Sequence, residues 1–251
     1  MPELRTSDRT RLRRHGALPG DDFLESRTIT ATGYVTTSDR DTAPEIAALI
    51  DGTITSDEDV LVMKWHGVGG NGLVRVNARV RRRHIPQAWP RWQRGEPQWA
   101  IQWEATDPRL YANTASSGSV GLAADTTGLT WALTWPLNWG GVSESNLLNC
   151  VNAGNFPTPV TLTITGPCTN PSVENVTQGR TLALTMTVAT GETVVIDTDA
   201  RTVLLNGTAS RYSKLTTAEW FDLDPGTDQL RFTASTATAA TMQADWRSAY
   251  I

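Results

Sequence analysis

This chain of 251 residues has little cysteine, no long apolar run and no excess of basic charge. Its two cysteines, Cys150 and Cys168, are too few for a disulfide framework, so we expect two reduced, mostly buried thiols. No run approaches the roughly 18 consecutive apolar residues of a membrane span. The arginine-rich start is not followed by an apolar segment, so we expect no secretory signal and synthesis in a cytoplasm.

The charge balance argues against a general nucleic-acid binder. The chain has 22 Lys+Arg and 26 Asp+Glu, for a net charge of -4. The charge is uneven, because residues 1–111 hold 16 basic and 15 acidic side chains and residues 112–251 hold 6 and 11. We therefore expect no specific nucleic-acid binding and two parts with different surfaces.

One short stretch has helix signals. Thr42 is a possible N-cap, Pro44 and Glu45 fall in the first turn, and Gly52 follows the end. The sequence predicts a helix of eight or nine residues from Ala43, which is too short to be stable alone and must pack on something.

Most other apolar residues alternate with polar ones, which is the period of a half-buried strand. In the run 73–81, Val74, Val76, Ala78 and Val80 lie on one face and Arg75, Asn77, Arg79 and Arg81 on the other. Further alternating runs are 99–105, 160–164, 182–188, 194–196, 203–205, 230–232 and 242–246. The predicted fold class is all-β with one short helix, built as sandwiches or barrels.

The pattern divides the chain into two β-rich domains, 1–111 and 140–251. Between them, residues 112–139 are expected to be a linker and a bridging strand, because 112–128 are small and polar without useful periodicity. The bridging strand carries an aromatic ridge of Trp131, Trp135 and Trp139. This ridge suits a core, a subunit contact or a platform on which sugar rings stack.

No residue pattern predicts a catalytic set, a cofactor site or a metal site. The glycine-rich run 67–72 precedes a strand rather than a helix, so it predicts a hairpin and not a dinucleotide loop. The paired carboxylates Asp197/Asp199 and Asp222/Asp224 could bind a cation or act in a glycosidase. Tight-turn chemistry explains them better.

The arginine face of 73–81 allows two interpretations. It is either a solvated edge strand, whose charges deter unwanted pairing, or an ion-pair surface between subunits. Acidic residues of the opposite sign lie just upstream, and the hypothetical interface comprises Arg75, Arg79, Arg81, Asp57, Glu58 and Asp59.

The second half resembles the C-terminal domain of siphovirus-type tail components, the distal tail protein family of long-tailed phages. The residues that carry this resemblance are Trp131 to Pro136, Asn152 to Asn155, Pro157 to Pro159, Thr163 to Pro167, Pro171, Asn175, Gly191 to Thr198, Arg201 to Val203, Asn206, Gly207, Trp220 to Leu223, Pro225, Gly226 and Trp246 to Tyr250. The first half is similar through Arg27 to Ile29, Gly33, the predicted helix and Asp107 to Tyr111. One departure is Asp228, where the family pattern leads us to expect Asn.

This resemblance implies a structural protein of the virion tail, assembled in the cytoplasm of the bacterial host, and not an enzyme. It implies a first domain with the tail-tube fold, a β-sandwich or split barrel, which is expected to form a hexameric ring. The second domain is implied to be a galectin-like β-sandwich. The implied partners are further copies of the chain, the tail tube protein and the hub proteins of the tail tip or baseplate, with DNA passing through the lumen.

Two other functions stay open at this stage. One is a carbohydrate-binding module that contacts glycans on the host surface, because aromatic faces stack on sugars. The other is a glycoside hydrolase using Asp197 or Asp222, which needs two carboxyl groups about 5–10 Å apart in a cleft. Neither alternative implies a cofactor or a membrane.

Overall fold

The structure is a computed structural model, and it describes residues 2–34, 57–65, 72–85, 96, 98–122, 146–237 and 239–251. It divides into two compact units, residues 1–111 with Ile251, and residues 112–250. The helix predicted from Ala43 and the aromatic ridge Trp131, Trp135 and Trp139 lie outside the described residues. Within them, every regular element is a strand except one 3-10 turn, η2 (Tyr212–Lys214), so the all-β prediction is confirmed.

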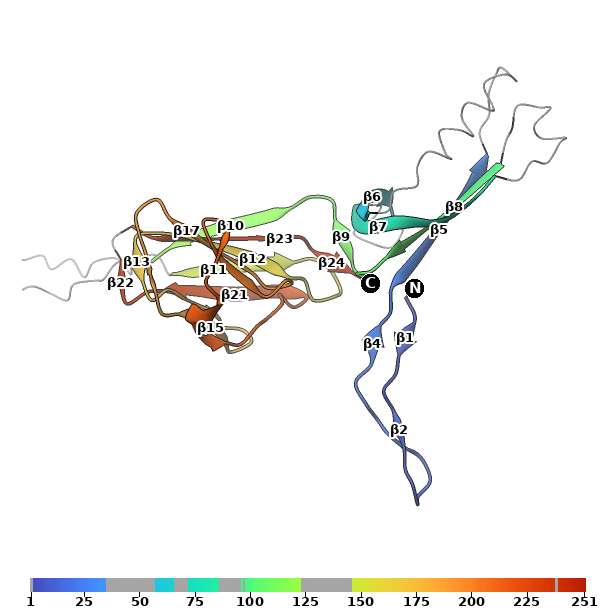
Figure 1. The fold of residues 1–251 in the computed structure, drawn as a ribbon, viewed down its shortest axis with the longest axis horizontal. Helices are drawn as coiled ribbons and strands as arrows, with labels where there is room; N and C mark the ends of the chain where they lie inside the picture. Colours follow the sequence, from blue (N-terminus) through green and yellow to red (C-terminus); the bar gives the residue numbers. More distant parts are fainter. Residues whose placement is uncertain are drawn as a thin grey trace, which may run out of the picture. The chain divides into compact units, whose positions relative to one another are not determined.

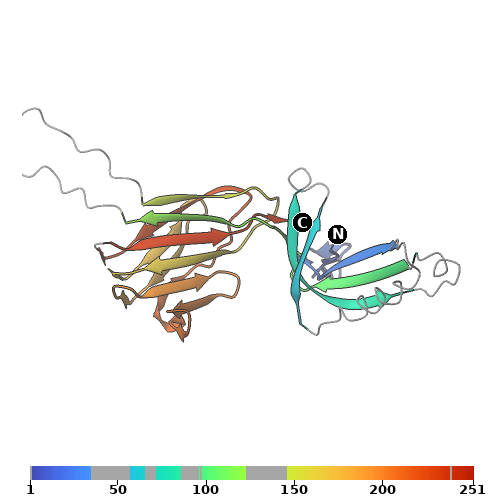
Figure 2. The same cartoon turned by 90° about the horizontal axis from the view of Figure 1, so that it is seen from above.

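The first unit is built on one antiparallel sheet (Figures 1 and 2). Its strands are β5 (Arg27–Tyr34), β6 (Asp59–Lys64), β7 (Leu73–His84), β8 (Gln98–Ala105) and β9 (Leu110–Ala112). The order across the sheet is β9-β7-β8-β5, and β6 pairs with β7 off this path. The connection from Lys64 to Leu73 is a hairpin because these residues lie opposite each other at the strand ends, as the glycine-rich run predicts.

The long strand β7 changes partners halfway. Its residues 73–78 pair with β6, and its residues from Arg79 onward pair with β8. The register shifts between Val80 and Arg82, which leaves Arg81 as an extra residue. A bulge of this kind bends a strand and increases its twist, so one strand can serve two pairings.

The alternation predicted for β7 is seen on its first half. Val74, Val76 and Ala78 are buried, and Ile29 on β5 and Ile101 on β8 are buried with them in the core of the unit. Beyond the bulge the alternation ends, because the four residues from Arg81 to His84 are all exposed.

A two-stranded hairpin precedes this sheet (Figure 1). Its outer pair is β1 (Leu4–Arg5) with β4 (Phe23–Leu24), and its inner pair is β2 (Arg9–Thr10) with β3 (Ala17–Leu18). Gly16 adopts a φ of +94° in the turn, a conformation that favours glycine.

The second unit is a β-sandwich of two antiparallel sheets (Figure 2). One sheet has the order β10 (Ser116–Gly121), β23 (Thr241–Trp246), β12 (Val160–Thr165), β17 (Thr193–Asp197), β18 (Thr202–Leu205) and β19 (Ala209–Ser210). The other has the order β11 (Leu147–Asn152), β21 (Gly226–Thr233), β14 (Ser172–Asn175), β15 (Arg180–Leu184) and β20 (Leu215–Ala218). A small third sheet has the order β16 (Thr187–Val188), β13 (Cys168–Thr169) and β22 (Thr236–Ala237), and β24 (Ala249–Tyr250) ends the chain.

Apolar side chains of both main sheets meet in one core. Leu162, Ile196 and Met242 come from the first sheet, and Leu182 and Phe232 come from the second, all fully buried. The Thr and other polar residues between them face outward, as expected for a sandwich with two wet outer faces.

Part of the segment expected to be a linker is a strand. Residues 116–121 form β10, which pairs with β23 along its whole length. The sequence concealed it because its side chains are small: a Cβ on Gly118 would lie 2.8 Å from Cδ1 of Leu148. The packing of Leu148 therefore favours a glycine where an alternating strand would carry an apolar side chain.

Candidate subunit interface

The hypothetical interface residues of the first unit lie on β7 and at the start of β6. Arg75 and Asp59 belong to the β6–β7 pair, whereas Arg79 and Arg81 lie where β7 runs along β8, and the other two acids precede β6. Arg75 lies opposite Val62 and Asn77 opposite Val60, so these side chains share one face of the pair. Val60, Val62 and Leu73 are exposed, while Arg75 and Arg79 are half-buried. This face therefore mixes arginine with exposed apolar side chains, rather than being the wholly charged face of a solvated edge.

The free edge of β6 adds backbone groups to this surface. Within the described ranges, β6 has β7 as its one strand partner. Unpaired N–H and C=O groups of an edge strand are a template for pairing with another chain. The β6 edge and its mixed face together have the features of a subunit contact.

Arg81 has an intrachain partner that the sequence did not indicate. Its Nε donates to Oε2 of Glu104 on β8, and the hydroxyl of Ser26 donates to the other carboxylate oxygen at 3.2 Å. The hydrogen bond from Arg81, followed by that from Ser26, lowers the pKa of Glu104 below its ordinary value. The bulge at Arg81 brings this pair together, so Arg81 is partly committed within its own chain.

Arg79 is different, because its Nε is buried and has no hydrogen-bond partner among the described residues. A buried N–H without an acceptor costs about 1–3 kcal/mol. Because the rest of the side chain is half-exposed, a change of rotamer would bring this N–H to an acceptor on a neighbouring chain and remove that cost. Arg79 is therefore the residue of this face most suited to an intermolecular contact.

The acidic segment lies at the start of β6, close to these arginines in the same chain. Asp59 is opposite Ala78, the residue before Arg79 on β7. Glu58 accepts a hydrogen bond from Thr106 at 2.7 Å, and Asp59 accepts one from the backbone N–H of Val60 at 2.6 Å. Asp59 therefore shares the face of Ala78, opposite to the face of Arg75, so the structure does not bring the acidic and basic groups together on one face. A contact of either group with a neighbouring chain stays a prediction.

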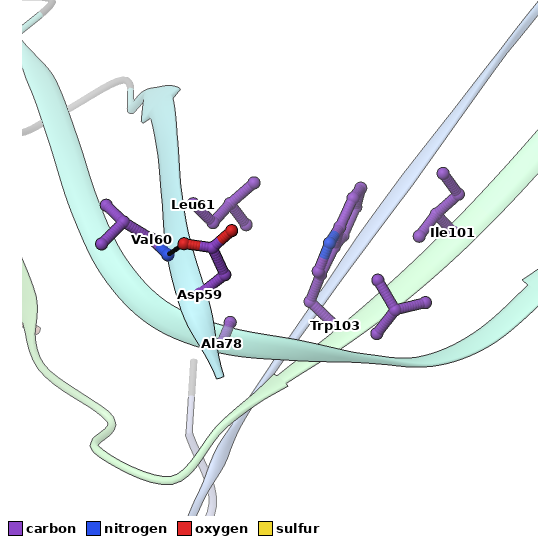
Figure 3. A pocket seen from close by; sticks show the side chains of 7 residues that line it. Asp59, Val60, Leu61, Ala78, Ile101 and Trp103 are labelled. Carbon is purple, nitrogen blue, oxygen red and sulfur yellow. Dashed lines mark hydrogen bonds between the residues drawn. The ribbon is translucent and has the colours of Figure 1, made fainter. Parts of the chain in front are cut away.

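A hollow of about 340 Å³ lies on the other side of this strand pair (Figure 3). Its lining residues are Asp59, Val60, Leu61, Ala78, Val80, Ile101 and Trp103. Figure 3 shows Leu61, Trp103 and Ile101 projecting to the same side, above the curve of β7. Asp59 supplies the one carboxylate of this mostly apolar wall.

A buried arginine ties the start of β5 to the segment before β9, and sequence reasoning did not assign it this role. Arg27 is 2% exposed, its Nε donates to the carbonyl oxygen of Pro108 at 2.6 Å, and its guanidinium lies 5.9 Å from the ring centre of Trp65. Burial lowers the pKa of Arg27, and the charge of Asp107 acts in the opposite direction. Asp107 also pairs with Arg109 at 2.9 Å. The two separated motifs that carry the family resemblance in this unit therefore meet in space.

In the second unit, one of the four carboxylates considered for chemistry closes a turn. Oδ1 of Asp197 accepts the N–H groups of Asp199 and Ala200 at 2.9 and 3.0 Å, which confirms the turn interpretation there. The N–H of Asp224 donates to Oδ2 of the buried Asp228 at 3.0 Å. No group of three or more His, Cys, Asp or Glu that could hold a metal occurs in the described part of the chain.

Asp228 is the centre of a buried polar network. Its Oδ2 also accepts Nδ2 of Asn175 at 3.0 Å and Nε2 of Gln178 at 2.9 Å. Asn175 is fully buried and Asp228 is 2% exposed. Asp228, the position that departs from the family pattern, therefore has a structural role as a buried hydrogen-bond acceptor.

Both cysteines are free and buried, as the sequence predicts. Burial, and then the charge of Asp228, raises the pKa of the Cys150 thiol to about 12. Burial also raises the pKa of Cys168. Such thiols stay protonated near neutral pH and are poor nucleophiles.

A smaller hollow of about 290 Å³ lies at one end of the sandwich. It is lined by Pro157, Gln178, Arg180, Thr198, Arg201, Trp220, Phe221, Asp222 and Asp224. The exposed ring of Tyr212 stacks on Trp220, with 6.3 Å between ring centres and 13° between planes.

Among the described residues, no helix is long and apolar enough to cross a membrane.

Comparison with known proteins gives one family match, in the second unit. Residues 153–250 match the family model described as "Siphovirus-type tail component, C-terminal domain", which confirms the resemblance predicted from the sequence. No curated protein sequence matches the chain.

Solved structures extend the likeness to the whole fold. The crystal structure of Dit (gp 19.1) of phage SPP1, described as a paradigm of the hub adsorption apparatus in phages that infect Gram-positive bacteria, matches with a TM-score of 0.67 and 12% identity, over 100% of this chain and 90% of that chain. Two structures of the phage P2 baseplate in its activated conformation, with Ca and with Sr, match with TM-scores of 0.48 and 0.49, at 11% identity, over 96% of this chain and 86% of theirs.

Proposed function

We propose that this chain, whose C-terminal unit belongs to the siphovirus-type tail component family, is a structural protein of a phage tail. Copies of it form a ring, expected to be a hexamer, that joins the tail tube to the tail tip or baseplate. DNA passes through the lumen of this ring. The observation that carries the proposal is the family match of residues 153–250 inside a two-unit fold similar to Dit over its whole length.

The surfaces of the first unit support the ring. A closed cyclic oligomer repeats one heterologous contact, in which two different patches of the same chain meet. The open edge of β6, its exposed Val60 and Val62, and the buried unpartnered Nε of Arg79 are suited to such a contact. In this assembly the partners are the tail tube protein and the hub proteins, and the location is the virion tail.

A role in joining rather than catalysis agrees with the chemistry of the described side chains. The turn-closing Asp197, the satisfied Asp228 and the protonated, buried cysteines have structural roles. DNA in transit must bind the wall weakly, because every phosphate neutralised by an arginine strengthens binding. We therefore expect Arg75 and Arg79 to be covered by protein and not to line the lumen.

The test of the ring is the mass of the purified full chain, measured by native mass spectrometry and multi-angle light scattering. A closed oligomer supports the proposal, and a chain that is monomeric at all accessible concentrations contradicts it. Arg79→Glu should reduce assembly, because it replaces an N–H donor that lacks a partner by a carboxylate, which can only accept. Lys214→Glu, at an exposed lysine of the second unit outside the hollow, is the control. Labelling of the chain in intact tails by electron microscopy tests its location.

Binding of host glycans is a second candidate function, favoured by the hollow at one end of the sandwich. Its wall combines the Trp220 ring with Arg180 and Asp222, and sugar binding uses an aromatic face beside groups that hydrogen-bond hydroxyls. A glycan array with the full-length protein tests this. Binding that is lost in Trp220→Ala supports it, and the absence of any bound glycan contradicts it.

A further inference from the structure

The hairpin before β5 has no core of its own. We call residues 3–25 the N-terminal arm. Every residue from Glu3 to Phe23 is exposed, and Figure 1 shows the arm running away from the sheet of its own unit. The seven residues from the start of β1 at Leu4 to the end of β2 at Thr10 correspond to roughly 20 Å at about 3.3 Å per residue.

The arm is nevertheless a specified structure. The Ser7 hydroxyl donates to the carbonyl oxygen of Asp21 at 2.8 Å, and the N–H of Gly20 donates to Oδ1 of Asp8 at 3.0 Å. A Cβ on Gly20 would lie 2.3 Å from Oγ of Ser7, so the two strands approach closely at this point. An isolated two-stranded hairpin is marginally stable in water. A hairpin with such bonds and no core is expected to be covered by another surface.

The arm exposes large apolar side chains at both of its ends. Leu12, which is fully exposed, and Leu18, at 52%, lie near the tip. Leu4, at 63%, and Phe23, at 53%, lie at the base. Side chains of this size at this exposure favour burial against a partner.

The charges of the arm separate along the same axis. The tip, residues 9–18, holds four arginines (Arg9, Arg11, Arg13 and Arg14) and no acidic residue. The base holds four exposed acids, Glu3, Asp21, Asp22 and Glu25, and one arginine, Arg5, whose guanidinium lies 5.8 Å from the ring centre of Phe23, so its net charge is negative. Among the described residues, none forms an ion pair with a tip arginine. Each end of the arm therefore has an apolar pair and charges opposite in sign to those of the other end.

We propose that the arm links copies of this chain head to tail, with the basic tip of one arm docked on the acidic base of the next copy's arm. Leu12 and Leu18 of one copy then pack against Leu4 and Phe23 of its neighbour. Each copy donates one tip and accepts one, which is the heterologous contact that a ring requires. The inference rests on the proposed ring and names one of the contacts that closes it.

Charge exchange tests this contact in the full-length chain. The tip reversal is Arg13→Glu with Arg14→Glu, and the base reversal is Asp21→Arg with Asp22→Arg. Each should weaken assembly at least tenfold, because like charges then face each other. The combined variant restores opposite signs and should recover most of the assembly. Arg211→Glu with Lys214→Glu, at the surface of the second unit and outside the hollow, makes the same charge change as the tip reversal and should leave the mass unchanged.

The outcomes separate this contact from the ring itself. A wild-type oligomer that the tip reversal leaves intact overturns the arm contact while the ring stands, and so does a combined variant that fails to recover. A tip reversal that keeps its oligomeric mass but loses retention on duplex DNA identifies a nucleic-acid contact instead and also overturns the proposal. A monomeric wild type overturns both the ring and the contact.

A crosslink tests the same geometry without changing charge. The double variant Leu12→Cys with Phe23→Cys places one thiol at each end of the arm. These positions are too far apart within one hairpin to form a disulfide, since bridged Cα atoms lie less than about 7 Å apart. Mild oxidation should therefore give a ladder of covalent multimers, with each single variant as control. The absence of a ladder in an assembled sample contradicts the contact.

Discussion

The two units of this chain bury their apolar side chains to different degrees. The second unit closes its core between two sheets, where side chains such as Leu162, Ile196 and Phe232 are fully buried. The described part of the first unit leaves Val60, Val62 and Leu73 exposed on one strand pair, and its arm has no buried residue between Glu3 and Phe23. The second unit thus buries its apolar core within its own fold, whereas the first unit exposes apolar side chains that another chain could cover.

The same contrast holds for polar groups. The buried carboxylate Asp228 has three donors, whereas the buried guanidinium groups of Arg27 and Arg79 each keep an N–H without a partner among the described residues. Buried polar groups in a complete fold are nearly always hydrogen-bonded. Arg27 is too deeply buried for another chain to reach, whereas the half-exposed Arg79 can find its partner on assembly.

The largest expected effect comes from the core of the second unit. Phe232→Ala removes a fully buried ring and should lower the free energy of unfolding of this unit by about 3–5 kcal/mol. Chemical denaturation followed by tryptophan fluorescence measures the change. Val151→Ala, at a position 52% exposed on the neighbouring β11, should change stability by less than about 0.5 kcal/mol. Equal losses in the two variants would contradict a closed core.

The Asp228 network should give the next largest effect. Asp228→Ala leaves the donors on Asn175, Gln178 and Asp224 without their acceptor, and we expect a loss of about 2–4 kcal/mol in unfolding free energy. Asp228→Asn keeps an oxygen and should lose clearly less. If Asn destabilises as much as Ala, then the negative charge and not the acceptor geometry holds the turn.

Residue periodicity was sufficient to predict much of this architecture. The alternation of Val74, Val76 and Ala78, and that of Val160, Leu162 and Ile164, places one face of each strand in a core because side chains alternate across a pleat. The turn function of Asp197 also followed from its place at a strand end. These features are local, so the sequence around each residue specifies them.

Other features depend on partners that are distant in the sequence. The bulge that brings Arg81 to Glu104 is a property of register between β7 and β8, which no single strand encodes. Strand β10 was missed because its small residues accommodate Leu148, a side chain from another strand. The role of Arg27 depends on Pro108 and Trp65, which are brought to it by folding. In each case the feature depends on a tertiary contact, which the local sequence pattern does not encode.

A smaller effect is expected in the core of the first unit. Val74→Ala removes two methyl groups from a fully buried site and should lower stability by about 1–3 kcal/mol. The measurement is the denaturation midpoint of the assembled and the dissociated protein. If assembly covers the first unit, its midpoint should rise with protein concentration, as for any coupling of folding to association. Concentration independence in both wild type and Val74→Ala would contradict the contrast between the two units.

The smallest effect concerns the exposed ion pair of Arg81 and Glu104. The folded-state pKa of Glu104 is depressed, so the stabilisation from this pair is present above the unfolded-state pKa and is lost as the pH falls through the folded-state value. NMR titration of the Glu104 carboxyl carbon should give a midpoint below that of an ordinary glutamate. Arg81→Gln, which removes the largest cause, should raise the midpoint more than Ser26→Ala does, and Arg211→Gln in the second unit should leave it unchanged. An equal midpoint in wild type and Arg81→Gln would show that the bulge does not hold this pair in solution, and Arg81 would then be available to a neighbouring chain.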